Sequence, residues 1–254
     1  MTPELKAVRE LLTPYGKLRA AINLGNPVLA QRSTKGELGG VSVALARFLA
    51  EQLNVTLELV PFDAAGKVVA ALDDNAWDVA FLAQDPKRAE TICFTAPYVI
   101  IEGTYLVPQE SSFFHVDDMD QPGRRIAVGQ GAAYDLFLTR TLRHAQLVRA
   151  PTSAAAVDWF VEQGLDAAAG VRQPLMRFAE ATPDYRVLPD SFTQIRQAMA
   201  LPRQRQEASG AVDAFLKECR ETGFVANALA ESGQADANIA PSGRSYPASW
   251  WAHD

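Results

Sequence analysis

Cysteine and histidine are scarce in this 254-residue chain, and their scarcity excludes several kinds of site. The two cysteines, Cys93 and Cys219, lie far apart, so neither a disulfide framework nor a CxxC metal or redox motif is available. One bridge between them and two free thiols both fit the sequence; we expect buried thiols, because free cysteine is commonly buried. The three histidines, His115, His144 and His253, show no metal-ligand spacing. The sequence therefore predicts no metal site and no cofactor.

Long apolar runs and an excess of positive charge are also missing. No apolar run approaches the roughly 20 residues needed to span a bilayer. Residues 1–17 carry charges throughout and no apolar signal region, so we expect either a cytoplasmic protein or one whose signal peptide was removed. The 24 basic and 30 acidic residues give a net charge of -6, which argues against nucleic acid or an anionic membrane as the main partner. Any site for an anion must therefore be local.

Segments typical of strands alternate with segments typical of helices along the chain. The expected strands are residues 18–25, 56–62, 78–83, 124–131, 145–151 and 165–171. The expected helices are residues 3–12, 42–54, 67–75, 133–145, 153–164 and 207–230, and residues 31–40 form a polar loop. This alternation indicates an α/β fold with parallel sheets.

The α/β segments form two sets, separated by an extended and then polar stretch at residues 104–123. Residues 196–204 are a candidate for a return crossing between the two sets. We expect a first lobe of residues 1–105 plus 200–240 and a second lobe of residues 106–199. Residues 241–254 have the composition of a disordered tail or an expression remnant.

Five stretches in a fixed order carry a family resemblance. They are KLRAAIN, GGVSVALARFLAEQLNV, WDVAFLAQDPKRAETICFTAPY, GRRIAVGQGAAYDLFL and GLDAAAGVRQPL. Together they resemble the type 2 periplasmic solute-binding proteins, in particular the amino-acid-binding branch, extracellular solute-binding protein family 3. The resemblance covers roughly residues 17–230. It implies two α/β lobes joined by two crossing hinge segments with a ligand cleft between the lobes, a periplasmic monomer, and a membrane permease of an ABC transporter as partner.

Arg88 is the first residue that the resemblance assigns to the ligand. The family's arginine after a "(T)PxR" turn binds a ligand carboxylate, and Asp85-Pro86-Lys87-Arg88 matches that turn. A guanidinium suits this role because its paired donors match a carboxylate. The alternative is an exposed arginine, or one paired with Asp85 or Glu90. The connection lacks the family's small hydroxyl residues, and Gln84 is expected to substitute for them.

A glycine turn that enters a helix is the second expected anion-binding element. Gly131 and Ala132 precede the helix that begins near Tyr134, and N–H groups at a helix start favour negative charge. An ordinary strand-to-helix loop is the alternative. Tyr134, and Phe62 at the end of another strand, are candidates for an apolar wall of the site, with packing in the core as the alternative.

The residues that would bind a ligand ammonium differ most from the family pattern. Asn23 and Val171 occupy the positions where the resemblance implies carboxylates. A buried ammonium without a partner costs several kcal/mol, so we expect zwitterionic amino acids to bind poorly. Asn23 and Asn26 would offer hydrogen bonds instead. Arg172, next to Val171, points either into the cleft, where it would tune selectivity, or outward as a hinge or surface arginine.

The sequence thus predicts a solute-binding protein that closes on a small anionic organic solute, without catalytic residues. Two alternatives remain. One is an enzyme on the same fold, similar to the cyclohexadienyl dehydratases, for which Glu102 and His144 are candidate acid/base groups, with a surface role for each as the alternative. The other is the ligand-binding module of a sensor.

Overall fold

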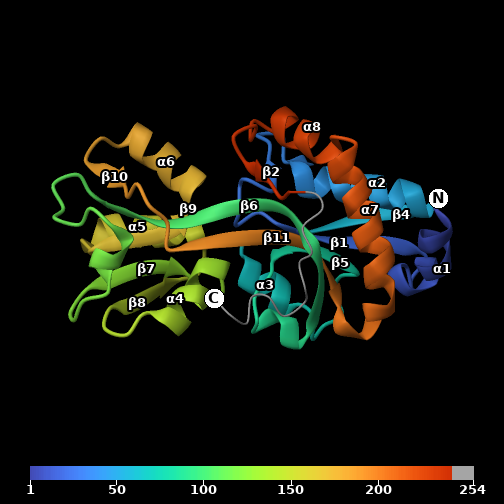
Figure 1. Cartoon of the computed structure of the whole chain (residues 1–254), viewed down its shortest axis with the longest axis horizontal. Coiled ribbons are helices and arrows are strands. Elements are labelled where there is room, and N and C mark those ends of the chain that lie inside the picture. The colour runs from blue at the N-terminus through green and yellow to red at the C-terminus, as the bar shows by residue number, and fades with distance from the viewer. Residues whose placement is uncertain (242–254) are drawn as a thin grey trace. The chain divides into compact units, whose positions relative to one another are not determined.

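The computed structural model describes residues 1–241, which form two compact units. Unit 1 contains Met1–Phe62, Lys67–Ile100 and the chain from Arg196 onward, and unit 2 contains Asp63–Gly66 and Ile101–Ile195. Apart from the short segment Asp63–Gly66, the chain changes unit within two long neighbouring strands, β6 (Ile92–Pro108) and β11 (Thr193–Pro202) (Figure 1). The sequence placed these changes near residues 105 and 199. The tail expected at 241–254 lies, apart from Pro241, outside the described residues.

The strands of unit 1 form a mainly parallel sheet, as the sequence predicted. Its order is β4 (Thr56–Phe62), β1 (Lys17–Asn23), β5 (Val79–Ala83) and β11. Strand β1 runs parallel to β4 and β5, and β11 runs antiparallel to β5. All five residues of β5 are buried, which agrees with its uninterrupted apolar sequence. The carboxyl ends of β1, β4 and β5 therefore lie along one edge.

The helices of unit 1 lie around this sheet (Figure 1). The first helix of the chain contacts helices near the end of the described chain, so segments distant in sequence pack together. The helices of the unit are α1 (Pro3–Leu12), α2 (Val41–Leu53), α3 (Ala65–Ala70, which begins in unit 2), α7 (Ser209–Glu221) and α8 (Phe224–Glu231), with short helices η1 (Arg88–Glu90) and η3 (Arg203–Ala208). Helix α1 begins where expected because the Thr2 side chain accepts a hydrogen bond from Leu5 N–H at 3.3 Å. Helix α3 is shorter than expected and passes into turns.

Short strands occur in three places where the sequence predicted none, one of which is β10 (Tyr185–Val187) in unit 2. The expected polar loop at 31–40 contains a hairpin of β2 (Gln31–Arg32) and β3 (Leu38–Gly39). Near the end of the described chain, β12 (Asn238–Ile239) pairs with β6. Strands β2, β3 and β12 have only two residues each, too few for an alternating pattern to show in the sequence.

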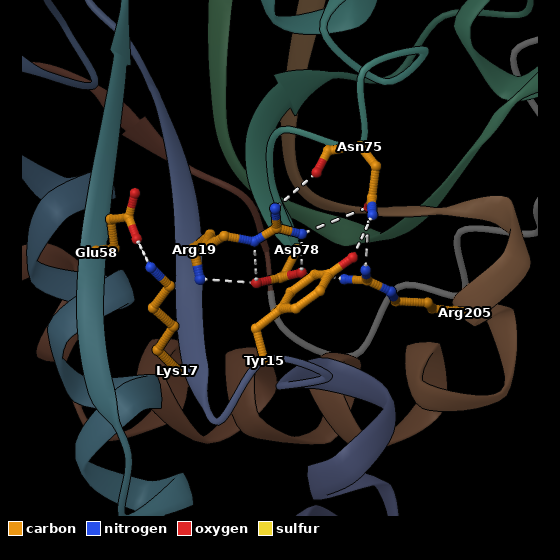
Figure 2. A network of polar contacts seen from close by, with 7 residues as sticks. All are labelled: Tyr15, Lys17, Arg19, Glu58, Asn75, Asp78 and Arg205. Atoms are coloured by element: carbon orange, nitrogen blue, oxygen red, sulfur yellow. Dashed lines mark hydrogen bonds and ion pairs between the residues drawn. The ribbon is translucent and has the colours of Figure 1, made fainter.

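A buried carboxylate joins three segments of unit 1 at the amino ends of β1 and β5. Asp78 is fully buried and accepts hydrogen bonds from Arg19 of β1 and from Arg205 of η3 (Figure 2). The Arg19 guanidinium also lies 4.5 Å from the centre of the Tyr15 ring and donates to Asn75 O. This network lies opposite to the carboxyl edge of the same strands. It joins β1, the residue before β5 and η3 at one end of the sheet, and its residues are not among those at the carboxyl edge.

Unit 2 is a second α/β layer with the order β6, β9 (Ala167–Val171), β7 (Arg125–Gly129) and β8 (Gln146–Ala150). Strand β7 runs parallel to β8 and β9, β9 runs antiparallel to β6, and β10 (Tyr185–Val187) also pairs with β6. The helices are η2 (Val116–Met119), α4 (Ala133–Thr141), α5 (Ser153–Gln163) and α6 (Arg172–Ala181). Its core includes Leu106, Ala127, Ala150, Ala156, Phe160, Leu165, Ala168 and Leu175.

Two helices of unit 2 differ from the sequence prediction. Helix α4 ends at Thr141 rather than near 145, because the Asp120 carboxylate accepts from the N–H groups of Arg143, His144 and Ala145 and holds that segment outside the helix. Helix α6 was not predicted, since it begins directly at the end of β9 without a loop to mark the change.

Both cysteines are free thiols, Cys93 partly and Cys219 fully buried. Within residues 1–241, no helix is long and apolar enough to cross a membrane, and no group of three or more His, Cys, Asp or Glu side chains is arranged to hold a metal ion.

Candidate functional site

The carboxyl edge of the unit 1 sheet brings together three of the predicted residues. Asn23 ends β1 and pairs with Phe62, the last residue of β4, while Gln84 directly follows β5. Phe62 is half-buried, and its carbonyl accepts from Leu24 N–H at 2.8 Å. In open α/β sheets, ligands bind beyond the carboxyl ends of strands. This edge is therefore the candidate site within unit 1.

Asn23 and Asn26 present hydrogen-bond donors at this edge. Gly25 N–H donates to Asn23 Oδ1 at 2.9 Å, and Val28 N–H donates to Asn26 Oδ1 at 3.2 Å. A backbone N–H can only donate, so these contacts fix which end of each amide is the oxygen. Both side chains are 7% exposed, and among residues 1–241 neither Nδ2 group has an acceptor. Each amide thus has its acceptor occupied and its donors available.

Arg88 is buried beside the end of β5. Its side chain is 3% exposed and Nη1 donates to Ala83 O at 3.0 Å. Loss of water around the guanidinium lowers the pKa of Arg88 to about 10, and the negative charge of Asp85 offsets part of this effect. The burial excludes the exposed arginine that the sequence allowed. A buried guanidinium favours a bound counter-anion.

The two acidic residues that the sequence offered as partners of Arg88 also contact other neighbouring residues. The Asp85 carboxylate accepts from the backbone N–H of Lys87 at 2.8 Å and of Arg88 at 3.3 Å, which fixes the turn into η1. Glu90 Oε2 binds Lys87 Nζ at 2.7 Å. Asp85 therefore shapes the turn that positions Arg88, and this capping role was not predicted.

Gln84 is held in one orientation at the same edge. Its Nε2 donates to Thr95 O at 2.8 Å, and its backbone N–H donates to Arg196 O at 2.9 Å. Its Oε1 is buried and accepts no hydrogen bond from residues 1–241. The side-chain amide is therefore held against Thr95 of β6, with its oxygen shielded from solvent.

In unit 2, the predicted glycine turn joins β7 to α4. Gly131 has a left-handed backbone with φ of +74°, and Ala132 precedes the helix without a side-chain cap. The Tyr134 hydroxyl lies under this turn, where it accepts from Gly129 N–H at 3.0 Å and shares a 2.7 Å hydrogen bond with Ser153 Oγ. Tyr134 is 2% exposed, so its ring packs in the core, the alternative left open from sequence.

An acidic residue that the sequence analysis missed occupies part of this helix start. Asp135 is buried, and its carboxylate accepts from Gly131 N–H at 2.9 Å and from Arg149 Nε at 3.0 Å. The Gly131 N–H, which was expected to face an anion, therefore donates to a carboxylate of the protein itself. The signal that could have indicated this contact is an acidic residue in the first helical turn.

Arg172 begins α6 and uses most of its donors inside unit 2. Nε donates to Glu102 Oε2 at 2.5 Å, and the two terminal nitrogens donate to the carbonyl oxygens of Leu188, Pro189 and Asp190 at 2.8–3.2 Å. The sequence offered a catalytic or a surface role for Glu102, but a single charge within the apolar run of β6 indicates a fixed partner. Arg172 therefore joins β6, α6 and the segment before β11.

Solved structures of amino-acid-binding proteins have a similar fold. The cysteine-binding protein from Campylobacter jejuni has 20% identical residues and a TM-score of 0.77, with 91% of this chain and 93% of that chain covered. An amino acid ABC transporter substrate-binding protein from Streptococcus pneumoniae, bound to L-arginine, has 22% identity and a TM-score of 0.76, with 89% and 98% covered. At these identities the likeness shows the fold alone, and it supports the two-lobed binding-protein architecture predicted from sequence.

Sequence comparison also finds an enzyme. A cyclohexadienyl dehydratase from Pseudomonas aeruginosa is 25% identical over 155 residues, which span 59% of this chain and 58% of the enzyme. The match thus covers little more than half of that relative. Residues 18–232, most of the chain, match the family described as bacterial extracellular solute-binding proteins, family 3. The chain therefore belongs to the family 3 solute-binding proteins.

Proposed function

We propose that this protein is the solute receptor of an ABC-type uptake system and that its solute is a small organic carboxylate rather than a standard amino acid. Members of the family are typically extracellular or periplasmic and work with membrane permeases, which supports the transport role. The observation that carries the choice of solute is the set of donors at the carboxyl edge of unit 1. Asn23, Asn26 and Arg88 all present N–H groups there.

Donors of this kind match a carboxylate and disfavour an ammonium. A carboxylate has only acceptor atoms, so it can accept from the guanidinium and from both amides. An ammonium has only donors and carries a positive charge, so it would face N–H groups and the positive charge of Arg88. The amino acids bound by the structural neighbours are therefore poor candidates for this chain.

The proposal divides the predicted residues into two roles. Asn23, Asn26 and Arg88 contact the carboxylate, and Phe62 and Gln84 contact the rest of the solute. Residues Gly131, Ala132, Tyr134 and Arg172 position the backbone of unit 2, since their described contacts lie within that unit.

The test is a calorimetric titration of small mono- and dicarboxylates and of standard amino acids against the wild-type protein and Asn23→Asp. The substitution keeps the acceptor for Gly25 N–H but places a negative charge among the donors. We expect the best carboxylate to bind at least about tenfold more weakly to Asn23→Asp, a loss of about 1.4 kcal/mol. Exposed Asn227→Asp, which makes the same charge change on α8, serves as the control. Submicromolar binding of a standard amino acid to the wild type would overturn the proposal.

An enzyme is the second candidate function, because the match to a cyclohexadienyl dehydratase favours it. Dehydration needs an acid that protonates the leaving hydroxyl group. Of the two groups considered from sequence, Glu102 accepts from Arg172, and His144 lies exposed beside the backbone contacts of Asp120. Incubation with cyclohexadienyl acids distinguishes the candidates, since a receptor returns the acid unchanged and a dehydratase yields an aromatic product that is detected by its absorbance.

A further inference from the structure

The segment Asp63–Gly66 joins unit 2 for four residues only. The chain on both sides of it, which ends at Phe62 and resumes at Lys67, belongs to unit 1. Phe62 is also the last residue of β4, at the edge that carries the proposed solute site. Any displacement of one unit relative to the other therefore acts directly on this short segment.

Gly66 lies with its backbone against the turn that joins β7 to α4 within unit 2. A Cβ atom at Gly66 would lie 3.0 Å from Gln130 O and 3.2 Å from Gly131 Cα, and a Cβ at Gly131 would lie 2.8 Å from Gly66 Cα. Side chains almost never place a Cβ within 3.0 Å of another atom. The two glycines thus allow a contact of backbone with backbone that a side chain at either position would obstruct.

The backbone conformation of Gly66 gives no reason for glycine at this position. Gly66 is the second residue of α3, and its φ is not positive, so other residue types could adopt the same conformation. Glycine destabilises a helix relative to alanine, because it loses more conformational freedom on folding. A glycine within a helix therefore indicates a packing requirement, and the close approach to the turn supplies one.

The turn that Gly66 contacts is held firmly within unit 2. Gln130 N–H donates to Ala150 O at 2.9 Å, and Gly131 N–H donates to the Asp135 carboxylate at 2.9 Å. Displacement of the turn would strain both hydrogen bonds. A side chain at residue 66 would consequently push its own segment away from the turn.

We propose that the contact between Gly66 and Gly131 is a clasp that forms in the solute-bound state, and that Gly66 is a positioning residue for solute binding. This inference rests on the proposed function. The flanks of the segment belong to unit 1 and its contact belongs to unit 2, so states of the protein can differ in whether the contact is made. A solute that contacts Phe62 favours the state in which the segment after Phe62 is held.

The test compares two glycines that occupy the same position in a helix. Gly66 and Gly210 are the second residues of α3 and α7, and nothing lies within 4 Å of a Cβ at Gly210. Wild type, Gly66→Ala, Gly66→Val and Gly210→Ala are titrated by calorimetry with acetate, succinate, benzoate, phenylpyruvate, L-alanine and L-phenylalanine. Urea denaturation without added solute measures the stability of each protein.

The clasp predicts opposite effects on affinity and on stability. We expect Gly66→Ala to bind the carboxylates that wild type binds at least about tenfold more weakly, and Gly66→Val to bind them more weakly still. Without solute, the urea midpoint of Gly66→Ala should equal or exceed that of wild type, because alanine favours the helix and the clasp is not formed. Gly210→Ala should keep the wild-type affinity. A contact that only supports the fold of unit 2 would instead lower the midpoint.

Each outcome decides between the clasp and the proposed function. Unchanged affinity in both Gly66 variants, or a lower urea midpoint or failed folding of Gly66→Ala, overturns the clasp and leaves the proposed function intact. Tightest binding of L-alanine or L-phenylalanine to wild type overturns the proposed function, and the same variants then test the clasp with that amino acid. Absence of binding of every probe to wild type that unfolds cooperatively overturns both.

Discussion

Arg19 binds the Asp78 carboxylate through three of its nitrogen atoms. The backbone N and Nε donate to Oδ2 at 2.8 and 3.0 Å, and Nη2 donates to Oδ1 at 2.8 Å. Hydrogen bonding to this carboxylate raises the pKa of Arg19 above its ordinary value. The pair connects β1 to the segment before β5, and Arg205 extends it to η3 (Figure 2).

Asp78→Asn should destabilise unit 1 strongly, because it leaves two guanidinium groups beside a neutral amide. We expect a loss of about 3 kcal/mol in the free energy of unfolding, measured by urea denaturation. Glu58→Gln is the control, since Glu58 forms an exposed pair with Lys17 in the same region and should change stability by less than about 0.5 kcal/mol (Figure 2). A similar loss in the two variants would contradict a central role for Asp78.

Tyr134→Phe should destabilise unit 2 by about 1–2 kcal/mol, because removal of the hydroxyl leaves the buried Gly129 N–H without its acceptor. Tyr15→Phe provides a matched comparison: its hydroxyl also accepts a hydrogen bond, from Asn75, but the side chain is 58% exposed and water can replace the contact. Thermal unfolding of both variants measures the difference. If Tyr134→Phe is as stable as wild type, the hydroxyl does not support the turn.

Gly103 on β6 allows a close approach of the Phe192 ring. A Cβ at Gly103 would lie 2.7 Å from that ring, so Gly103→Ala should cost about 1–3 kcal/mol of unfolding free energy. The loss should largely disappear in a background that carries Phe192→Leu, and a double-mutant cycle measures this coupling. Gly210→Ala, where nothing lies within 4 Å of the added carbon, should cause no loss. Equal losses at Gly103 with and without Phe192 would show that strain elsewhere is responsible.

Carboxylate binding should depend on the protonation of Arg88. Burial lowers the pKa of this guanidinium to about 10, so the charged form that attracts an anion is present at neutral pH and is lost as the pH rises through about 10. We expect constant affinity between about pH 7 and 9 and a decline above about pH 10, measured by calorimetry with thermal unfolding at each pH as a check of the fold. An affinity that stays constant to pH 11 in folded protein would contradict a lowered pKa of Arg88 in the binding site.

Much of the fold could be predicted from the sequence, because its signals are local. The uninterrupted apolar run of β5 and the capped helix α1 appear where the residue pattern placed them. The two-residue strands and α6 could not be predicted, since the former are too short to show a period and the latter has no loop before it.

For the site, the sequence by itself determined which residue types end the strands of each unit: Asn23 and Gln84 in unit 1, and Arg172 in unit 2. Only the tertiary structure decided what their polar atoms contact. It placed the Asn23 oxygen on a backbone N–H, the Gln84 nitrogen on a carbonyl, and the Arg172 guanidinium on Glu102. The physical reason is that a hydrogen bond depends on direction and on atoms distant in sequence, whereas periodicity reports only which side of an element is buried.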